Sequence, residues 1–183
     1  MPARIAESIM GKQLEEFLLH KKTSLLKKWL ERLLETYPPE TGKFWLDQKD
    51  PFANPIGATF HEGLEGIFEG ILQGKGENDL TPALGPMIHI RAVQEFSPSR
   101  AIAFVFLLKE IVREELVKEG GARVSSEEWR EFDSLVDQLG LMAFDLYTEC
   151  RKKIHEIQLR ELKSRTMPAR EARGGCFREK SDP

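Results

Sequence analysis

Apolar residues recur at intervals of three and four along most of this chain, and no segment alternates apolar with polar residues for long enough to indicate a β-strand. This spacing predicts an all-α fold with five long helices and one or two short ones. Proline and glycine separate the helical segments, because proline has no backbone N–H and glycine adopts the conformations at which helices end. The predicted helices cover residues 12–20, 24–37, 41–48, 55–74, 81–96, 98–119 and 126–163.

Several predicted helix starts carry capping signals. Thr23 is a candidate cap for the second helix, although the first two segments can also join into one bent helix. Two further starts place a capping side chain directly before a proline in the first helical position, and the last start has the spacing of a capping box. These pairs are Asn54 with Pro55, Ser97 with Pro98, and Ser125 with Glu128.

Four glycines line one face of the predicted helix over residues 55–74, namely Gly63, Gly66, Gly70 and Gly74. Each glycine inside a helix costs roughly 1 kcal/mol relative to alanine. Such a face therefore indicates that another helix backbone packs closely against it. The alternative is a ligand that lies on the glycine face.

Two helices carry long apolar patterns. Residues Ala101–Leu108 are apolar nearly all round, which predicts a central helix with Phe104 and Leu108 buried, together with Phe106 or Leu107. The last helix has a predicted buried seam of Phe132, Val136, Leu139, Ala143, Leu146 and Cys150.

The seam of the last helix continues beyond the length that a compact body can cover. Cys150, Ile154 and Ile157 recur there at spacings of four and three between charged residues, which is typical of a helix that pairs with another helix. We expect a homodimer formed through these residues about a two-fold axis. The alternative is that the stripe folds back on the first helix of the same chain.

The charge is unevenly distributed along the 183 residues. Residues 1–150 hold 17 Lys and Arg against 25 Asp and Glu, whereas residues 151–183 hold 10 against 5. The net charge of −3 argues against a dedicated nucleic-acid binder, which usually has a strongly basic domain. The pattern divides the chain into a flexible arm over 1–11, one helical domain over 12–163 and a disordered tail over 164–183.

The cysteines and apolar runs indicate the cellular setting. Cys150 and Cys176 form neither a metal-binding spacing nor a disulfide framework, which is typical of a protein of the reducing cytoplasm. The first residues hold no apolar segment of signal-peptide length, and the longest apolar run, Ala101–Leu108, is too short to span a bilayer. No membrane insertion is expected.

The motifs of common enzyme classes are absent from the sequence. There is no phosphate-binding glycine loop, nucleophile elbow, paired metal spacing or kinase signature. His61 and Glu62 begin a zinc-protease pattern, but Glu65 stands where that motif requires a second histidine. We expect no catalytic residue and no metal site, and a protein that acts by binding.

Three stretches resemble a known family: LLKKWLERLLETYPPETGKFWLDQKDPFANPIG, FHEGLEGIFEGIL and IRAVQEFSPSRAIAFVFLLKEIVREEL. Over residues 12–160 the chain resembles the N-terminal domain of RsbT co-antagonist proteins of the RsbR/RsbRD type, most specifically in the joint from Arg91 to Arg100. The resemblance implies a cytoplasmic signal-input module of the stress response, generally attached to a STAS output domain or a histidine kinase. It also implies a globin-like helical bundle without haem that dimerises, and a protein partner in a signalling complex.

No segment of the chain resembles a STAS domain, so the phosphorylatable threonines of that domain have no counterpart and a stand-alone sensor domain is expected. Stand-alone members imply an alternative function, an accessory or adaptor subunit that docks on a larger complex of energy metabolism.

The order of the predicted helices also fits a globin, which makes two histidines candidate ligands. His61 and His89 are 28 residues apart, similar to the distal and proximal histidines of haem globins, and a short corner and Pro98 follow His89. A haem-binding sensor is therefore one alternative. The others are a different small apolar or anionic ligand, and protein docking without any cofactor.

Arg91 and Arg100 flank the joint between two predicted helices. An arginine on an otherwise apolar helix usually pairs with a carboxylate, here Glu95. The alternative is that it faces a cleft and binds an anion or an acidic group of a partner. Together with His61 and His89, these two arginines are the candidate ligand-binding or partner-binding residues.

Overall fold

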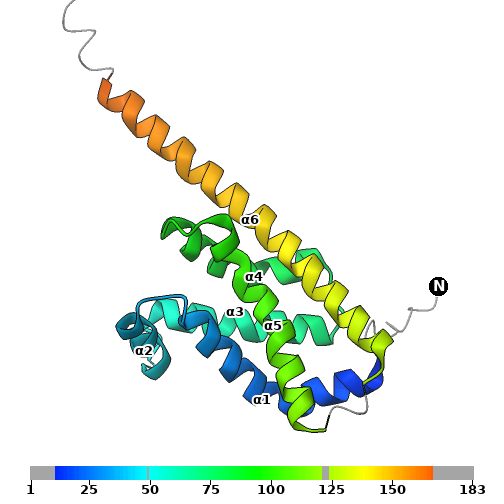
Figure 1. Ribbon diagram of the computed structural model, residues 1–183. Coiled ribbons are helices and arrows are strands. Elements are labelled where there is room, and N and C mark those ends of the chain that lie inside the picture. Colours follow the sequence, from blue (N-terminus) through cyan, green and yellow to red (C-terminus); the bar gives the residue numbers. More distant parts are fainter. Residues whose placement is uncertain (1–10, 49, 121–123, 167–183) are drawn as a thin grey trace, which may run out of the picture.

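The computed structural model describes residues 11–48, 50–120 and 124–166, which form six helices and no strand within those ranges. Five helices are long and one is short, as the apolar spacing predicts (Figure 1). Their bounds are α1 Lys12–Leu34, α2 Pro39–Asp47, α3 Pro55–Leu72, α4 Glu77–Val93, α5 Pro98–Lys118 and α6 Ser126–Thr166. The expected arm and tail lie almost entirely outside the described residues, although α6 continues three residues past the expected domain end at 163.

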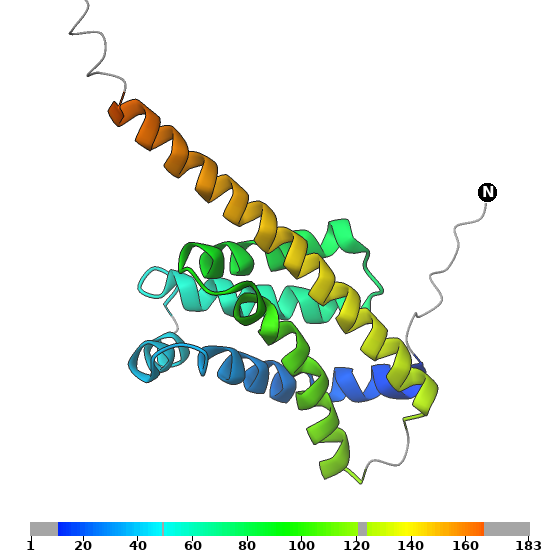
Figure 2. The same ribbon diagram turned by 45° about the horizontal axis from the view of Figure 1, so that its top comes forward.

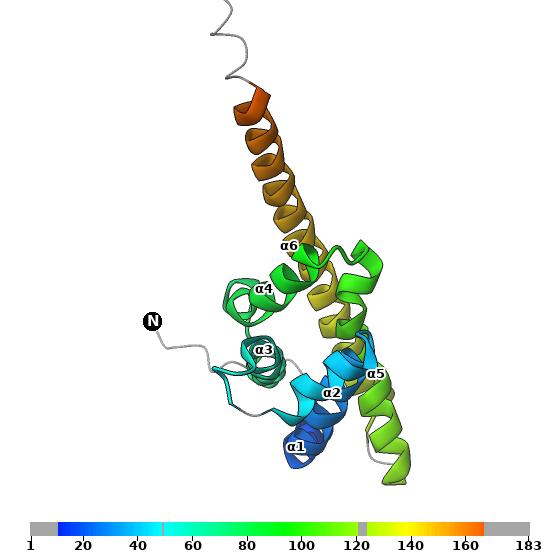
Figure 3. The same ribbon diagram turned by 90° about the vertical axis from the view of Figure 1, so that its left-hand side faces the viewer.

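The five long helices form a closed ring of neighbours. α1 packs against α3, α3 against α4, α4 against α6, α6 against α5, and α5 returns to α1 (Figure 3). α2 covers one end of α1 and α3. Large side chains from different members of the ring meet inside it fully buried, among them Trp29, Phe60, Phe104 and Phe132. The indole N–H of Trp29 donates to the carbonyl of Phe104 at 2.7 Å and ties α1 to α5.

α1 is one continuous helix, so the expected cap at Thr23 is wrong and the alternative of a single helix is confirmed. Its buried residues Leu14, Leu18, Leu25 and Trp29 lie at spacings that keep them on one face through the middle of the helix. Because this face is covered along its whole length, packing outweighs the local signal for a break. The Pro38-Pro39 pair ends the segment, and α2 begins at Pro39.

Three other helices begin at the residues that the capping signals predict. The Asn54 side chain accepts from the backbone N–H of Gly57 at 2.9 Å, and Pro55 is the first residue of α3. Ser125 N–H donates to Glu128 Oε2 at 2.8 Å, and Glu128 N–H donates to Ser125 Oγ at 3.2 Å, which confirms the capping box. Pro98 begins α5, although the Ser97 side chain makes no capping bond.

α5 is one member of the ring and not the central helix that its apolar run predicts. Phe104 and Leu108 are buried as expected, but Leu107 is only half-buried and Phe106 is 37% exposed. Phe106 lies against α6 at Gly140, where an added Cβ would overlap its ring. The apolar residues on this side of α5 therefore form a close contact with α6 at the edge of the core.

Candidate functional site

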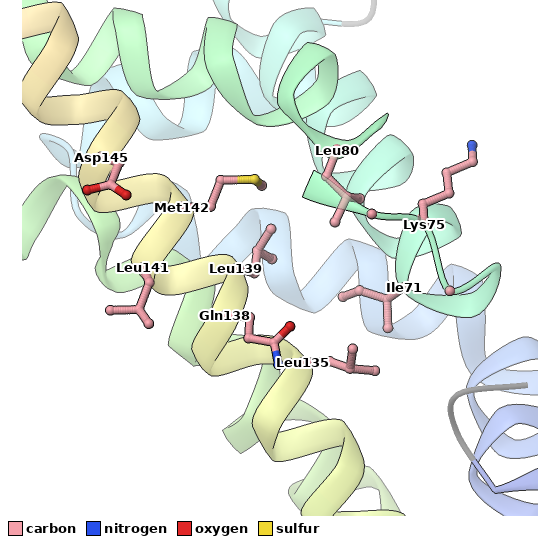
Figure 4. A pocket seen from close by; sticks show the side chains of 12 residues that line it. Ile71, Lys75, Leu80, Leu135, Gln138, Leu139, Leu141, Met142 and Asp145 are labelled. Carbon is pink, nitrogen blue, oxygen red and sulfur yellow. The ribbon is translucent and has the colours of Figure 1, made fainter. Parts of the chain in front are cut away.

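A cavity of about 310 Å³ lies between the turn that joins α3 to α4 and the middle of α6 (Figure 4). Its lining residues come from the end of α3, the turn, the start of α4 and two to three turns of α6. They are Gly70, Ile71, Gly74, Lys75, Gly76, Leu80, Leu135, Gln138, Leu139, Leu141, Met142 and Asp145. Pockets that bind small molecules have volumes of about 300–1,000 Å³.

The glycine face of α3 divides into two parts with different surroundings. An added Cβ on Gly63 would lie 2.9 Å from the carbonyl oxygen of Ala83, and one on Gly66 would lie 2.9 Å from the Ala83 Cβ, so α4 packs closely here as expected. Gly70 and Gly74 line the cavity, and an added Cβ on Gly70 would also overlap the Leu80 side chain of α4. Gly74 has a φ of 60°, a left-handed conformation that favours glycine and lets the chain turn towards α4.

Most side chains that point into the cavity are apolar. Ile71 approaches from α3, Leu80 from α4, and Leu139 and Met142 from α6 (Figure 4). Gln138 is the polar side chain on this side of α6, and its amide N–H₂ lies 3.5 Å from Ser134 Oγ. The charged ends of the other two polar side chains in the lining, Lys75 and Asp145, point away from the centre of the cavity. The side chains that line the cavity therefore offer apolar contact and one amide.

The two candidate histidines lie elsewhere. His61 on α3 and His89 on α4 are both exposed, and neither lines this cavity. An axial haem ligand must present its imidazole to an enclosed cofactor. The two side chains do not fit a haem in this arrangement. No group of three or more His, Cys, Asp or Glu side chains among residues 11–48, 50–120 and 124–166 is placed to hold a metal ion.

Arg91 is fully buried at the joint between α4 and α5. Its Nη1 donates to Thr36 Oγ1 at 3.1 Å, and its Nη2 donates to the backbone carbonyl of Arg100 at 2.7 Å. The guanidinium also lies near three aromatic rings, with its central carbon 4.3 Å from the ring centroid of Phe96, 5.2 Å from that of Tyr37 and 5.7 Å from that of Phe104. Arg91 thus connects the end of α1 with α4 and α5.

The expected ion pair between Arg91 and Glu95 does not form. Glu95 is exposed, lies beyond the end of α4 and has a φ of 59°, so the four-residue spacing of a helix face does not apply to it. Within the described part of the chain, Arg91 Nε and the Tyr37 hydroxyl are buried without a hydrogen-bond partner. Burial lowers the pKa of Arg91, and burial likewise raises the pKa of Tyr37 against the opposing effect of the nearby guanidinium.

Arg100 lies on the exposed side of the same joint. Its guanidinium carbon lies 5.0 Å from the ring centroid of Phe96, the ring that Arg91 also contacts. Its Nη2 is 3.5 Å from the carbonyl oxygen of Thr36. The structure therefore brings Arg91 and Arg100 together around one aromatic ring, whereas His61 and His89 are not part of this cluster.

The end of α6 extends beyond the ring (Figures 1 and 2). Arg151 Nη1 donates to the carbonyl of Ala92 at 3.1 Å, and Cys150 and Ile154 pack partly against the core. From His155 to Arg165 every side chain is exposed, including Ile157 at 55%. α6 meets α1 near its start, through Glu128, so the expected alternative of a fold-back on the first helix is wrong.

Comparison with protein families gives one match. The family model of the RsbT co-antagonist protein RsbRD N-terminal domain matches residues 23–162. The chain belongs to this family. An RsbRD N-terminal domain is a regulatory module of RsbT co-antagonists in stress signalling, and the resemblance carried by the joint at Arg91–Arg100 is thereby confirmed.

No curated protein matches the chain, and no solved structure matches it. Among the helices of the described residues, none combines the length and apolarity needed to cross a membrane.

Proposed function

We propose that this RsbRD N-terminal domain is a non-catalytic signal-input module that acts by binding, and that it binds a second copy of itself through the end of α6. We call residues 150–165 the outer α6. One observation carries the proposal: from His155 onward this stretch leaves the body while still bearing large apolar side chains. The globin-like arrangement that the resemblance implies is part of the same proposal.

The outer α6 has the features of a helix that needs a partner. With 3.6 residues per turn, Cys150, Ile154 and Ile157 share one face. An isolated helix of this length is marginal in water, because few bonds offset the ordering of its backbone. A second outer α6 related by a two-fold axis would cover the stripe on both chains. The stripe is short, so the affinity should be modest.

The four other candidate residues have different places in this proposal. Arg91 is buried and holds the joint together. His61, His89 and Arg100 are exposed, so they are candidate contacts for a partner on the outside of the ring.

The oligomeric state tests the proposal. Sedimentation should show the wild-type chain at twice the monomer mass at micromolar concentration. Ile157→Glu should give a folded monomer, because its side chain is already half in solvent and its replacement disturbs no core contact. Ile154→Glu combined with Ile157→Glu should do the same, with circular dichroism as the check on folding, since Ile154 packs partly on the core.

The matched control for the double variant replaces two exposed aliphatic residues outside the outer α6, Leu19→Glu with Val117→Glu. This variant adds the same charge and should remain a dimer. A wild-type chain that is monomeric at high micromolar concentration would contradict the proposal.

A second candidate function is favoured by the charge of the outer α6. It carries six Lys and Arg against two Glu, a net charge of +4. Two parallel copies would therefore repel each other, whereas an acidic helix of another protein would be attracted. In that case the domain acts as an adaptor. A wild-type monomer that binds an acidic helical partner, and loses it in the Ile157→Glu variant, would support this function.

A further inference from the structure

We infer that the cavity between the α3–α4 turn and α6 is the ligand site of this domain, and that it takes a small, neutral, predominantly apolar molecule. The binding itself does not depend on how the outer α6 associates. Its regulatory consequence rests on the proposed function.

The chemistry of the lining sets the charge of the ligand. An ion that enters the cavity would lose part of its hydration and meet apolar side chains from α3, α4 and α6. Burying a charge without a partner is strongly unfavourable. The charged ends of Lys75 and Asp145 point away from the cavity, so neither supplies that partner. A neutral molecule avoids this cost.

The lining also sets how polar the ligand can be. Buried water is stable where it finds two to four polar partners. The side chains that converge here offer one amide, that of Gln138, among the side chains of Ile71, Leu80, Leu139 and Met142. Water against these apolar side chains is therefore poorly bonded, and an apolar molecule that displaces it there gains affinity. One hydrogen-bonding group on the ligand can be satisfied by Gln138.

The backbone of the turn leaves room for this ligand. Gly70, Gly74 and Gly76 present no side chain on their part of the wall, and Gly74 has the left-handed conformation that a larger residue rarely adopts. The glycines inside α3 each cost roughly 1 kcal/mol relative to alanine. Gly63, Gly66 and Gly70 are explained by the close approach of α4, since an added Cβ on Gly70 would overlap the Leu80 side chain. Gly70 and Gly74 lie at the cavity.

The position of the cavity connects the ligand to the proposed output. One wall is the α3–α4 turn and the opposite wall is the stretch of α6 from Leu135 to Asp145. The same helix continues into the outer α6. A ligand that binds more tightly at one distance between these walls shifts the population of the domain towards that position of α6. Its difference in affinity sets the size of the shift.

Two matched probes test the inference on the full chain. N-phenyl-naphthylamine is neutral and apolar, and anilinonaphthalene sulfonate has the same ring system with an added negative charge. Fluorescence titration should show saturable binding of one neutral probe per chain, tighter than the charged probe by roughly tenfold or more. Equal or tighter binding of the sulfonate would overturn the neutral ligand class. Absence of saturable binding of the neutral probe would overturn the site.

Filling the cavity locates the bound probe. Leu135→Trp should weaken binding of N-phenyl-naphthylamine by roughly tenfold or more, and Val117→Trp on the exposed face of α5 should not change it. Gln138→Trp is a second filling variant at an exposed position, which keeps the test open if Leu135→Trp does not fold. A folded filling variant that binds the probe as the wild type does would overturn the inference.

Titration of the Ile157→Glu variant separates this inference from the proposed function. The cavity contains no residue of the outer α6, so that variant should bind the neutral probe as tightly as the wild type does, whatever its oligomeric state. Loss of binding in this variant would show that the site depends on the assembly, contrary to the inference.

Discussion

Arg91 is a buried cation held by aromatic faces and two oxygen acceptors, without a carboxylate beside it. A guanidinium suits this place because it is planar, donates in several directions and stacks on rings. A lysine ammonium can offer none of the stacking. The free-energy cost of desolvating the charge is offset by these contacts, and the consequence is a joint in which three helix ends are held by one side chain.

Substitutions of Arg91 should show how much of its contribution to stability comes from packing and how much comes from its charge. Arg91→Ala removes the donors to Thr36 Oγ1 and to the Arg100 carbonyl and leaves a void beside Phe96, so we expect a loss of about 3–5 kcal/mol in the free energy of unfolding. Arg91→Met fills much of the same space without a charge, and replacing a buried ion with an apolar residue is often nearly neutral. Arg91→Met should therefore be clearly more stable than Arg91→Ala in urea unfolding.

Arg91→Lys is the matched test of geometry, since it retains the charge but not the planar donors. We expect its stability to lie below that of the methionine variant. A lysine variant as stable as the wild type would contradict this account of the joint.

Among the helices, α1 and α6 share a cap. The Glu128 carboxylate accepts from Ser125 N–H at the start of α6, and it also accepts from Gln13 N–H at 3.0 Å at the start of α1. These backbone bonds lower the pKa of Glu128 below its usual value of 4.5, chiefly through the Ser125 N–H. One side chain thereby satisfies free donors at two helix N-termini that are far apart in the sequence.

Glu128→Gln should reduce stability at neutral pH by about 0.5–2 kcal/mol, the usual range for a lost or weakened cap. The lowered pKa means that the ionised carboxylate stabilises the fold fully above pH 4.5, and that this contribution disappears as the pH falls through the lowered value. Urea unfolding at neutral and acid pH should therefore show the difference between wild type and variant shrinking in acid.

Glu127→Gln is the matched control for this measurement, because Glu127 is exposed and makes only a 3.4 Å contact with Arg130. A difference between Glu128→Gln and wild type that stays constant with pH would show that the charge of Glu128 is not what stabilises the two starts.

Local sequence signals predicted where helices begin more accurately than they predicted which residues the helices contact. Asn54 and the Ser125–Glu128 pair fixed two helix starts, because caps depend on residues within one turn. The expectation that Phe106 or Leu107 is buried was wrong, because an apolar residue at a helix contact and one in a core give the same pattern in the sequence. The expected partner of Arg91 failed for a related reason, namely that α4 ends before Glu95.

The sequence predicted only part of the lining of the cavity. The glycines of α3 indicated a close approach or a ligand; the close approach of α4 occurs at Gly63 and Gly66, and a cavity lies beside Gly70 and Gly74. Nothing in the sequence showed that Gln138 and Met142 would face Gly70 and Gly74. That register depends on how α6 crosses the α3–α4 turn, which is decided by packing across the whole ring.

At the scale of the whole molecule, the positive charge of the outer α6 opposes its self-association. The outer α6 is basic, whereas residues 1–150 are acidic, with 17 Lys and Arg against 25 Asp and Glu. Two parallel copies of the outer α6 would bring like charges within a Debye length, which is about 10 Å at 0.1 M salt and about 3 Å at 1 M.

Raising the salt concentration should therefore strengthen the homodimer, because screening removes repulsion while the apolar stripe remains. Sedimentation of the wild-type chain at low and high sodium chloride measures this directly. A dimer that weakens as salt rises would mean that opposite charges hold it, and would place each basic outer α6 against an acidic surface.

α6 is held at its start by the shared cap, and its far end extends beyond the body, so the helix can work as a lever. At about 1.5 Å per residue, Met142 at the cavity lies roughly 21 Å from Glu128, and Arg165 lies roughly 56 Å from it. If the shared cap at Glu128 is the fulcrum, each ångström of movement at the cavity becomes about 2.6 Å at the tip. The contact of Arg151 with Ala92 would slide by an intermediate amount. A displacement too small to disturb the core at the cavity can in this way shift the register of two paired tips.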